Sequence, residues 1–404
     1  MKKNIAIYIM LLLAPLTFLS CDQWGGETVE SAYREPQIPD PTYQFKRNGS
    51  SSIDYLECGL LRDPLDYIYN SYLKIASIMY QANMDKVQDY FCNGEFGLKP
   101  KEELASSPLH KADRARILKD VEDIFQTTGV LSGLSKPSPG TYRNRKAKPG
   151  QGGYVGTNIG DVNIAFANEK GVIVAEMFNG IVWGGVYLDK ILNTHLNDSL
   201  YNDTRLRREH ESTTLLPGRN YTELEHHWDL AYGYYQYWLP FIQTSGLSVL
   251  RESRIKIYNA FAIGRQALTE FRYEEVQAQL LLIRDELSKV AAVRAMSLLV
   301  GEITLVNLDE DINNALVFLS KGCGAVYGLQ FTLQASGNPY LSYEEATHFI
   351  AQLTAGSGLW DKQRLLGSES TEGSLKNVAA AIGKCYGLTP VSYTHLRAHE
   401  TAAN

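Results

Sequence analysis

The sequence is poor in cysteine and lacks the short motifs of several common catalytic and metal sites. Five cysteines occur in 404 residues, and no two are spaced C-x-x-C, the pattern of many zinc and thiol-redox sites. G-x-S-x-G and H-E-x-x-H are also absent, so the sequence offers neither a nucleophilic serine motif nor a zincin-type site. In an exported protein the four cysteines after residue 21 could form disulfides in one of three connectivities. They are Cys58, Cys92, Cys323 and Cys385.

The chain also lacks an excess of positive charge. Lys and Arg number 39 against 45 Asp and Glu, which gives a net charge of -6, whereas nucleic-acid-binding proteins usually carry a basic excess. Nucleic acid is therefore not an expected partner. With 44% hydrophobic and 21% charged residues, the composition is that of an ordinary globular protein. After the N-terminal segment, no stretch is apolar enough to predict a membrane-spanning helix.

The N-terminal segment has the features of a secretory signal. Lys2 and Lys3 precede an apolar run from residue 5 to 19, and Ser20 stands directly before Cys21. The last four of these residues, FLSC, resemble a bacterial lipobox, which implies lipidation of Cys21; the alternative is an ordinary signal peptide with a chance cysteine. We expect a signal peptide at 1–20, a flexible tether at 21–42, and export to the cell envelope with a lipid anchor at the outer membrane.

The other end of the chain looks foreign to the protein. Residues 391–404 read VSYTHLRAHETAAN and resemble the translated read-through of a sequencing-library adapter. They contain His395 and His399 followed by Glu400, a spacing that would put both imidazoles on one helix face. We interpret this segment as an artefact and exclude it from the functional interpretation.

Helical periodicity dominates the residues between these ends. Apolar side chains recur at three- and four-residue steps, as from Leu65 to Met79, which is typical of amphipathic helices. The predicted helices span about 63–84, 111–130, 164–196, 221–245, 252–270, 274–302, 310–329, 342–354 and 374–386. Because strand-like alternation is rare, we predict an all-α domain over residues 43–390, with a loop at 135–156 between two helical halves.

Local signals support individual helices and one close contact. Ser342, which precedes Glu344 and Glu345, and Asp311, which precedes an apolar series, stand where helix N-caps are expected. Gly180, Gly184 and Gly185 lie inside a predicted helix, where each glycine costs roughly 1 kcal/mol of helix propensity. We therefore predict that these glycines allow another helix to approach closely.

The stretch LEHHWDLAYGYYQYW, residues 224–238, holds the candidate site residues. On a helix, His227 points with the apolar stripe, where a histidine is more often a hydrogen-bonded core residue than a ligand. The alternative is a metal or ligand site. In that hypothesis His226 and His227 bind the metal or ligand, and their co-ligands come from Glu223, Glu225 and Asp229.

A metal site has one further argument in its favour. The Glu223-x-x-His226 step is one that helix bundles use to present a carboxylate and an imidazole to a metal, and Glu345-x-x-His348 is a second copy. Two such steps with two further carboxylates would form a di-iron site. Asp229 could otherwise orient His226 as one member of an acid-base pair.

Four collinear blocks of sequence carry a family resemblance. They are YQFKRNGSSSIDY at 43–55, EHHWDLAYGYY at 225–235, NAFAIGRQAL at 259–268 and LSKGCGAVYGLQF at 319–331. Together they resemble a domain-of-unknown-function family of Gram-negative lipoproteins that is similar to imelysin, the peptidase M75-like, iron-regulated group. The resemblance implies an all-α fold of two helix-bundle halves, an envelope location and a link to iron or haem acquisition.

The resemblance is incomplete at the site. Imelysins carry a Gly-x-His-x-x-Glu motif, and this chain has Glu225 at the glycine position, His227 at the histidine and Leu230 at the glutamate. A later histidine and glutamate of the related lipoproteins are replaced by Val317 and Lys321. Loss of a carboxylate weakens a hard-cation site and removes the usual general base.

The sequence therefore favours a non-enzymatic envelope lipoprotein that binds a small ligand, a metal or a partner such as an outer-membrane receptor. The binding surface would be a groove between the helical halves, and iron is the cofactor that the resemblance implies. The alternatives are an imelysin-type metallopeptidase, a SusD-like glycan-capture lipoprotein and a structural envelope protein. A peptidase needs a metal that activates water, glycan capture needs an exposed aromatic platform, and a structural protein needs neither.

Overall fold

The computed structural model describes residues 43–74, 81–94, 97–134, 145–156, 165–244 and 248–388. The predicted signal peptide, tether and C-terminal artefact lie outside these residues, as does the part of the 135–156 loop before residue 145. The described residues all belong to one compact unit. Cys58, Cys92, Cys323 and Cys385 are all free thiols, so none of the three possible disulfide connectivities is present among them.

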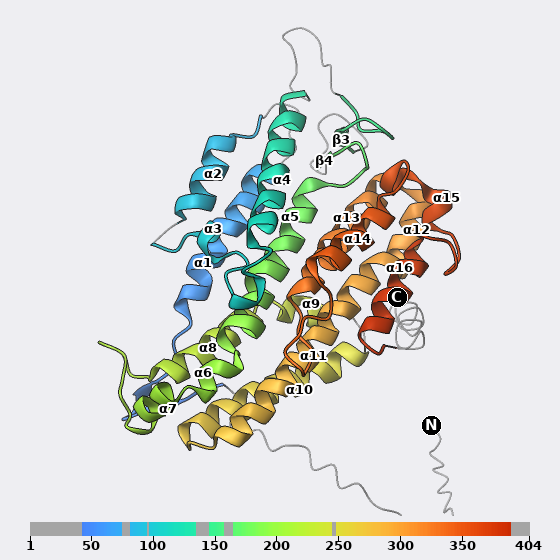
Figure 1. Ribbon diagram of the computed structural model, residues 1–404. Coiled ribbons are helices and arrows are strands. Elements are labelled where there is room, and N and C mark those ends of the chain that lie inside the picture. The colour runs from blue at the N-terminus through green and yellow to red at the C-terminus, as the bar shows by residue number, and fades with distance from the viewer. Residues whose placement is uncertain are drawn as a thin grey trace, which may run out of the picture. The chain divides into compact units, whose positions relative to one another are not determined.

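The described residues are predominantly helical, which confirms the predicted all-α fold (Figure 1). The first part of the chain contains α1 (Leu56–Tyr67), the π-helical η1 (Ile68–Leu73), α2 (Met84–Asn93), α3 (Pro100–Glu103), η2 (Pro108–His110), α4 (Arg114–Leu134), α5 (Val174–Val182) and the π-helical η3 (Trp183–His195). The next elements are α6 (Asp198–Asn202), α7 (Thr204–Glu211), α8 (Glu223–Tyr235) and α9 (Leu239–Thr244).

The C-terminal part continues with the two longest helices. They are α10 (Ser248–Thr269) and α11 (Tyr273–Val300). After them come α12 (Glu302–Glu310), α13 (Ile312–Gly328), η4 (Leu329–Phe331), α14 (Tyr343–Leu353), η5 (Gly358–Trp360), α15 (Lys362–Leu365) and α16 (Leu375–Cys385). Ser342 and Asp311 cap α14 and α13 as predicted, each accepting a hydrogen bond from a first-turn backbone N–H.

Strands are short in the part of the chain that the structure describes. β1 (Lys46–Arg47) pairs with β2 (Ser50–Ser51), and β3 (Gly153–Val155) pairs antiparallel with β4 (Ala165–Ala167), with Gly153 opposite Ala167. The helix predicted from residue 164 was therefore wrong at its start, because β4 occupies residues 165–167 and α5 begins only at residue 174. The first predicted helix also begins seven residues earlier than expected, at residue 56 rather than 63.

Helices α5 and α13 approach each other through paired glycines. A Cβ added to Gly180 would lie 2.3 Å from the backbone of Gly324, and one added to Gly184 would lie 2.5 Å from the Cα atom of Gly328. No side chain fits at either distance, so the prediction of a close helix approach is confirmed for these two glycines. Gly185 instead faces side chains, with its added Cβ 2.7 Å from Leu104.

Helix α11 packs against α10, α13 and α16. Residues 273–310, which comprise α11 and α12, are long and apolar enough to cross a membrane by length and composition, which the sequence analysis did not anticipate. The same property is expected of a core helix. Gly301, with a ψ of 152°, interrupts the helical backbone between α11 and α12, and the buried side chains of α11 pack in the main core.

Candidate functional site

Helix α8 carries all five sequence-predicted candidates, and its start is fixed by a capping box. Thr222 caps the helix, and its Oγ1 accepts a hydrogen bond from the Glu225 N–H while Glu225 Oε2 accepts one from the Thr222 N–H at 2.9 Å. Such reciprocal bonds satisfy two backbone donors that would otherwise lack partners. One carboxylate oxygen of Glu225 is therefore committed to the helix terminus.

Two arginines also donate hydrogen bonds to the Glu225 carboxylate. Arg47 binds both oxygens at 2.9 Å, and Arg265 Nη1 donates to Oε1 at 2.9 Å. Burial raises the pKa of Glu225, but the charges of Arg265 and Arg47 outweigh it and lower that pKa to about 2. Glu225 is thus a buried, ionised partner of arginines and has no free lone pair directed at His226 or His227.

Asp229 belongs to the same buried network. Its Oδ1 accepts hydrogen bonds from Arg265 Nε at 3.0 Å and from the Tyr43 hydroxyl at 2.6 Å, while Oδ2 is buried without a partner. Burial raises the pKa of Asp229 to about 6 despite the nearby Arg265. Asp229 contacts these two residues and not His226, so the acid-base pair considered from the sequence is not formed.

Glu223 and His226, the two candidates on the polar flank of α8, contact different groups. His226 stacks on Tyr221, with ring centroids 4.8 Å apart, and its Nδ1 lies 3.2 Å from the carbonyl oxygen of Asp54. Glu223 is partly exposed and lies 3.9 Å from Arg205. The Glu223-x-x-His226 step therefore does not present both side chains to one point.

His227 meets a partner that the sequence did not indicate. Its Nδ1 lies 2.9 Å from Nδ1 of His195, which ends η3, and the ring of Tyr234 stacks on His195 at 5.9 Å. Burial lowers the pKa of His227 to about 4, and burial together with His227 lowers the pKa of His195. Both imidazoles are therefore neutral at pH 7. No sequence spacing links residues 195 and 227, so no motif could have revealed this pair.

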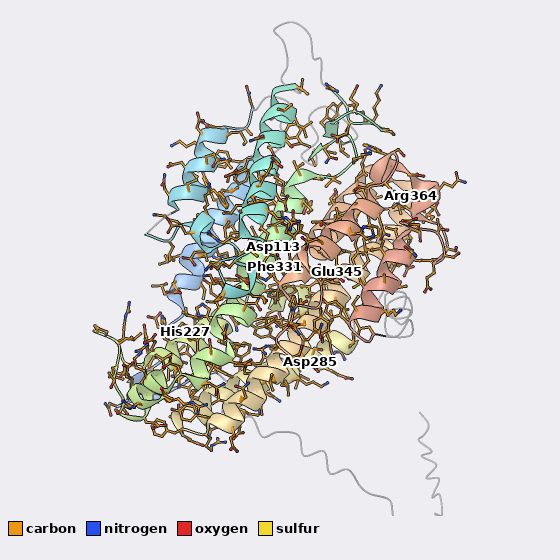
Figure 2. The ribbon with its side chains drawn as sticks, viewed as in Figure 1. Asp113, His227, Asp285, Phe331, Glu345 and Arg364 are labelled. Carbon is orange, nitrogen blue, oxygen red and sulfur yellow. The ribbon has the colours of Figure 1, made fainter. Side chains whose placement is uncertain are left out.

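The second Glu-x-x-His step lies elsewhere in the fold. Figure 2 shows Glu345 on α14, well away from His227 on α8. Glu345 accepts a hydrogen bond from the Ser342 N–H at 2.7 Å, and both Glu345 and His348 are exposed. Across the described ranges, no three His, Cys, Asp or Glu side chains come together in a group that could hold a metal ion. The di-iron arrangement considered from the sequence is therefore not formed by these residues.

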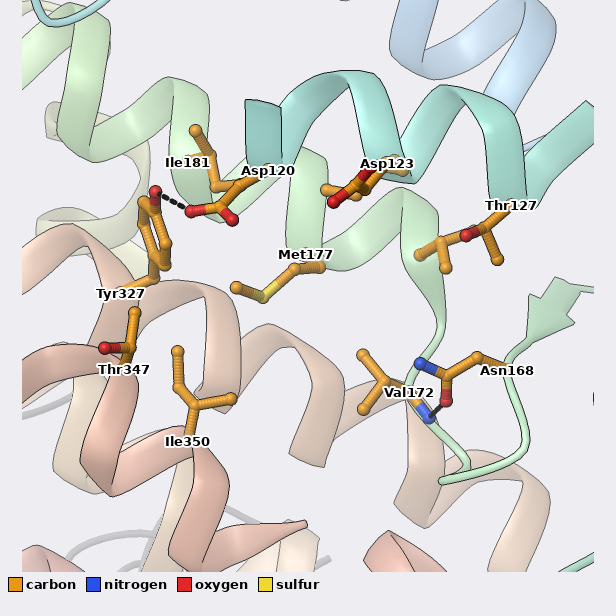
Figure 3. Close-up of a pocket in the computed structure, with 12 residues that line it drawn as sticks. Asp120, Asp123, Thr127, Asn168, Val172, Met177, Ile181, Tyr327, Thr347 and Ile350 are labelled. Atoms are coloured by element: carbon orange, nitrogen blue, oxygen red, sulfur yellow. Dashed lines mark hydrogen bonds between the residues drawn. The ribbon is translucent and has the colours of Figure 1, made fainter. Parts of the chain in front are cut away.

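A groove between α4 and α14 is the concave site that the sequence could not locate. It has a volume of about 290 Å³, and its floor is formed by α5 and α13 (Figure 3). Its lining residues come from two stretches of the chain, 120–181 and 327–350. They are Asp120, Asp123, Ile124, Thr127, Asn168, Val172, Val174, Met177, Ile181, Tyr327, Thr347 and Ile350.

One end of this groove is polar and ordered by hydrogen bonds. Asp120 Oδ2 accepts from the hydroxyls of Tyr327 at 2.6 Å and Tyr343 at 2.9 Å. Burial and the Asp120 carboxylate raise the pKa of Tyr327 far above its ordinary value, so its hydroxyl remains a donor. Met177 and Ile181 form an apolar surface beside this end. The groove therefore offers an acidic end next to an apolar wall.

The four sequence blocks that carry the family resemblance have structural roles. Tyr43, Arg47, Glu225, Asp229 and Arg265 come from the first three blocks and meet in the buried ion network. The fourth block supplies the two α13 glycines of the α5–α13 contact and a tyrosine of the groove. The residues of these blocks thus hold helices and the segment after residue 42 together.

The family model of a domain of unknown function, DUF4856, matches residues 40–389, which include all four blocks. No curated protein and no solved structure gives a significant match. Because the match covers most of the chain, the protein belongs to the DUF4856 family.

Proposed function

We propose that this protein is an exported, non-enzymatic lipoprotein of the cell envelope that binds a small ligand in the groove between α4 and α14. The observation that carries the proposal is that helices from both parts of the chain line a groove of about 290 Å³. Ligand sites typically combine an apolar wall with a few placed polar groups. The Asp120 end and the Met177 wall of this groove supply both.

The side chains of the groove suggest the chemistry of the ligand. Asp120 and Asp123 provide negative charge at the α4 side, and Thr127 and Thr347 provide hydroxyls. A ligand with an apolar body and a cationic or hydrogen-bond-donating end would satisfy both surfaces. We infer that binding such a ligand serves nutrient acquisition. This role agrees with the envelope location that the lipobox and the imelysin-like resemblance imply.

Filling the groove tests the proposal. The chain purified from envelope fractions should carry a small molecule detectable by native mass spectrometry, and Met177→Trp should remove it because the larger side chain occupies the groove. Ile255→Trp is the matched control, since Ile255 lies on α10, away from the groove, and is 48% exposed. A bound mass that is the same in the wild type and Met177→Trp, with both folded, would contradict the proposal, as would a protein that carries none.

The anchor is tested separately. Cys21→Ala should move the protein from the membrane to the soluble envelope fraction and abolish incorporation of a labelled fatty acid. If the variant stays in the membrane and still takes up the fatty acid, the lipoprotein proposal is wrong.

A second candidate function is metal binding at His195 and His227, whose Nδ1 atoms are hydrogen-bonded to each other in the structure and close enough to bind one ion. Two metal–nitrogen bonds of about 2.0–2.1 Å with an angle near 90° would span the 2.9 Å between the two Nδ1 atoms. Imidazoles suit zinc and iron, and the imelysin-type peptidase alternative would need such a metal. Titration of ferrous, ferric and zinc ions into wild type, His227→Ala and His226→Ala tests it, because only His227→Ala should lose near-stoichiometric metal.

A glycan platform has less support from the same helix. Trp228 and Tyr235 of α8 are fully buried, so they are not available to stack on a sugar ring.

A further inference from the structure

Arg294 of α11 lies against aromatic rings from η3 and α9 and from the segment between α8 and α9. Its guanidinium carbon is 3.8 Å from the ring centroid of Trp183, 5.4 Å from that of Phe241 and 5.6 Å from that of Trp238. Trp183 and Trp238 meet edge to face, with centroids 4.9 Å apart. Arg294, Trp183 and Phe241 are each only partly buried, so the guanidinium is not sealed inside the core.

The guanidinium has no acceptor among the described residues. It makes no hydrogen bond or ion pair there, although a guanidinium carries five N–H donors. The indole N–H of Trp238 is also buried without a partner. By contrast, the buried Arg265 and Arg284 both reach carboxylates, at 3.0 and 3.2 Å. Because Arg294 is only partly buried, its N–H donors can reach solvent or a ligand.

Contacts with aromatic faces compensate this charge only in part. Cation–π contacts stabilise the charge over the ring faces, but they leave the N–H edge of the guanidinium without an acceptor. Burial lowers the pKa of Arg294 to about 10, which Glu176 opposes, so the arginine remains charged at pH 7. Glu176 is itself bound by the Tyr69 hydroxyl at 3.0 Å and makes no ion pair with Arg294 within the described chain.

We propose that Arg294 and the partly exposed rings of Trp183 and Phe241, packed on the buried Trp238, form a second binding site, which takes an organic monocarboxylate. The planar guanidinium stacks on Trp183 and keeps its N–H edge for a carboxylate, which it binds bidentately. The partly exposed rings of Trp183 and Phe241 contact the apolar body of such a ligand. A single negative charge is favoured over a phosphate dianion because the carboxylate of Glu176 is close enough to act electrostatically on Arg294.

This site is separate from the groove between α4 and α14, because the two share no residue. The proposal therefore goes beyond the proposed function, and each can fail without the other.

The test is isothermal titration of the full chain, purified in detergent, with hexanoate and phenylacetate, and with inorganic phosphate as the competing chemistry. We expect saturable binding of a monocarboxylate, no saturable binding of phosphate, at least tenfold weaker binding in Arg294→Lys, and none in Arg294→Met. The exposed Arg251 provides the control, and Arg251→Met should bind as the wild type does.

A second readout separates a binding role from a purely structural one. A bound carboxylate should raise the melting temperature of the wild type by mass action and leave that of Arg294→Met unchanged. The proposal is overturned if neither carboxylate binds the wild type, if Arg294→Met binds with unchanged affinity, or if phosphate binds as tightly. Should Arg294→Met fail to fold by circular dichroism, Arg294→Lys decides, and unchanged affinity in that variant equally overturns the proposal.

Discussion

Replacement of Arg265 by methionine tests whether the buried ion network holds α8 and α10 together. Arg265 is fully buried and donates to Asp229, Glu225 and the Ser52 carbonyl. Methionine retains much of the apolar volume but removes the charge, so Asp229 loses its cationic partner. Glu225 keeps Arg47. Removal of one partner of a buried ion pair typically costs about 3–5 kcal/mol.

The protonation of Asp229 sets an upper limit on its contribution to the stability lost in Arg265→Met. A buried carboxylate without a partner can bind a proton instead, which limits the penalty to the free energy of protonation. Asp229 has a folded-state pKa of about 6 in the wild type, so at 1.36 kcal/mol per pH unit its contribution to the penalty is at most about 1.4 kcal/mol at pH 7 and close to zero at pH 5. The variant raises the folded-state pKa of Asp229 further above its unfolded value. The stability lost at pH 7 is therefore regained as the pH falls.

Urea denaturation of residues 43–390 at pH 7 and pH 5 measures both quantities. The matched control is Arg284→Met, because Arg284 is also buried but its partner Asp198 is 43% exposed and can be solvated when the arginine is lost. We expect a smaller penalty in Arg284→Met and little change of that penalty with pH. An Arg265→Met penalty below about 1 kcal/mol at pH 7, or one that does not decrease at pH 5, would refute the reasoning.

Three further predictions concern other parts of the chain. Gly180→Ala should lower the free energy of unfolding by more than 1 kcal/mol in urea denaturation, because its Cβ would lie 2.3 Å from Gly324 and overpacking typically costs about 1–3 kcal/mol; wild-type stability would show that α5 and α13 separate easily. His227→Ala should cost about 1–3 kcal/mol at pH 7, and His226→Ala less. Burial holds the pKa of His227 near 4, so the stability that neutral His227 provides is present above pH 6.5 and is lost as the pH falls towards 4. His227→Ala should therefore flatten the pH dependence of the unfolding free energy between pH 6.5 and 4. If the pH dependence is unchanged, other groups cause it. Deletion of 391–404 should leave the melting temperature and circular dichroism unchanged, whereas a shift of more than a few degrees, about 1 kcal/mol, would show that the segment packs on the domain.

The helices and their caps could be predicted from the sequence because their causes are local. Apolar periodicity marked α10, α11 and α13 to within a few residues, and Ser342 could be recognised as a cap from its neighbours alone. The glycines at 180 and 184 indicated a close contact because glycine inside a helix has a recognisable cost. Boundaries failed where a short strand interrupted the pattern, as at residues 165–167.

Side-chain partners were decided only by the tertiary structure. In the sequence, Glu225 and Asp229 are carboxylates that could serve as metal co-ligands. In the structure they form a buried ion network with Arg47 and Arg265, which are distant along the chain. His227 likewise pairs with His195, 32 residues away. Periodicity fixes which face of a helix a residue occupies, because that depends on the backbone of one segment. The partner of a charged or polar side chain depends on which distant segments pack against that face and exclude water, and no local pattern contains that information.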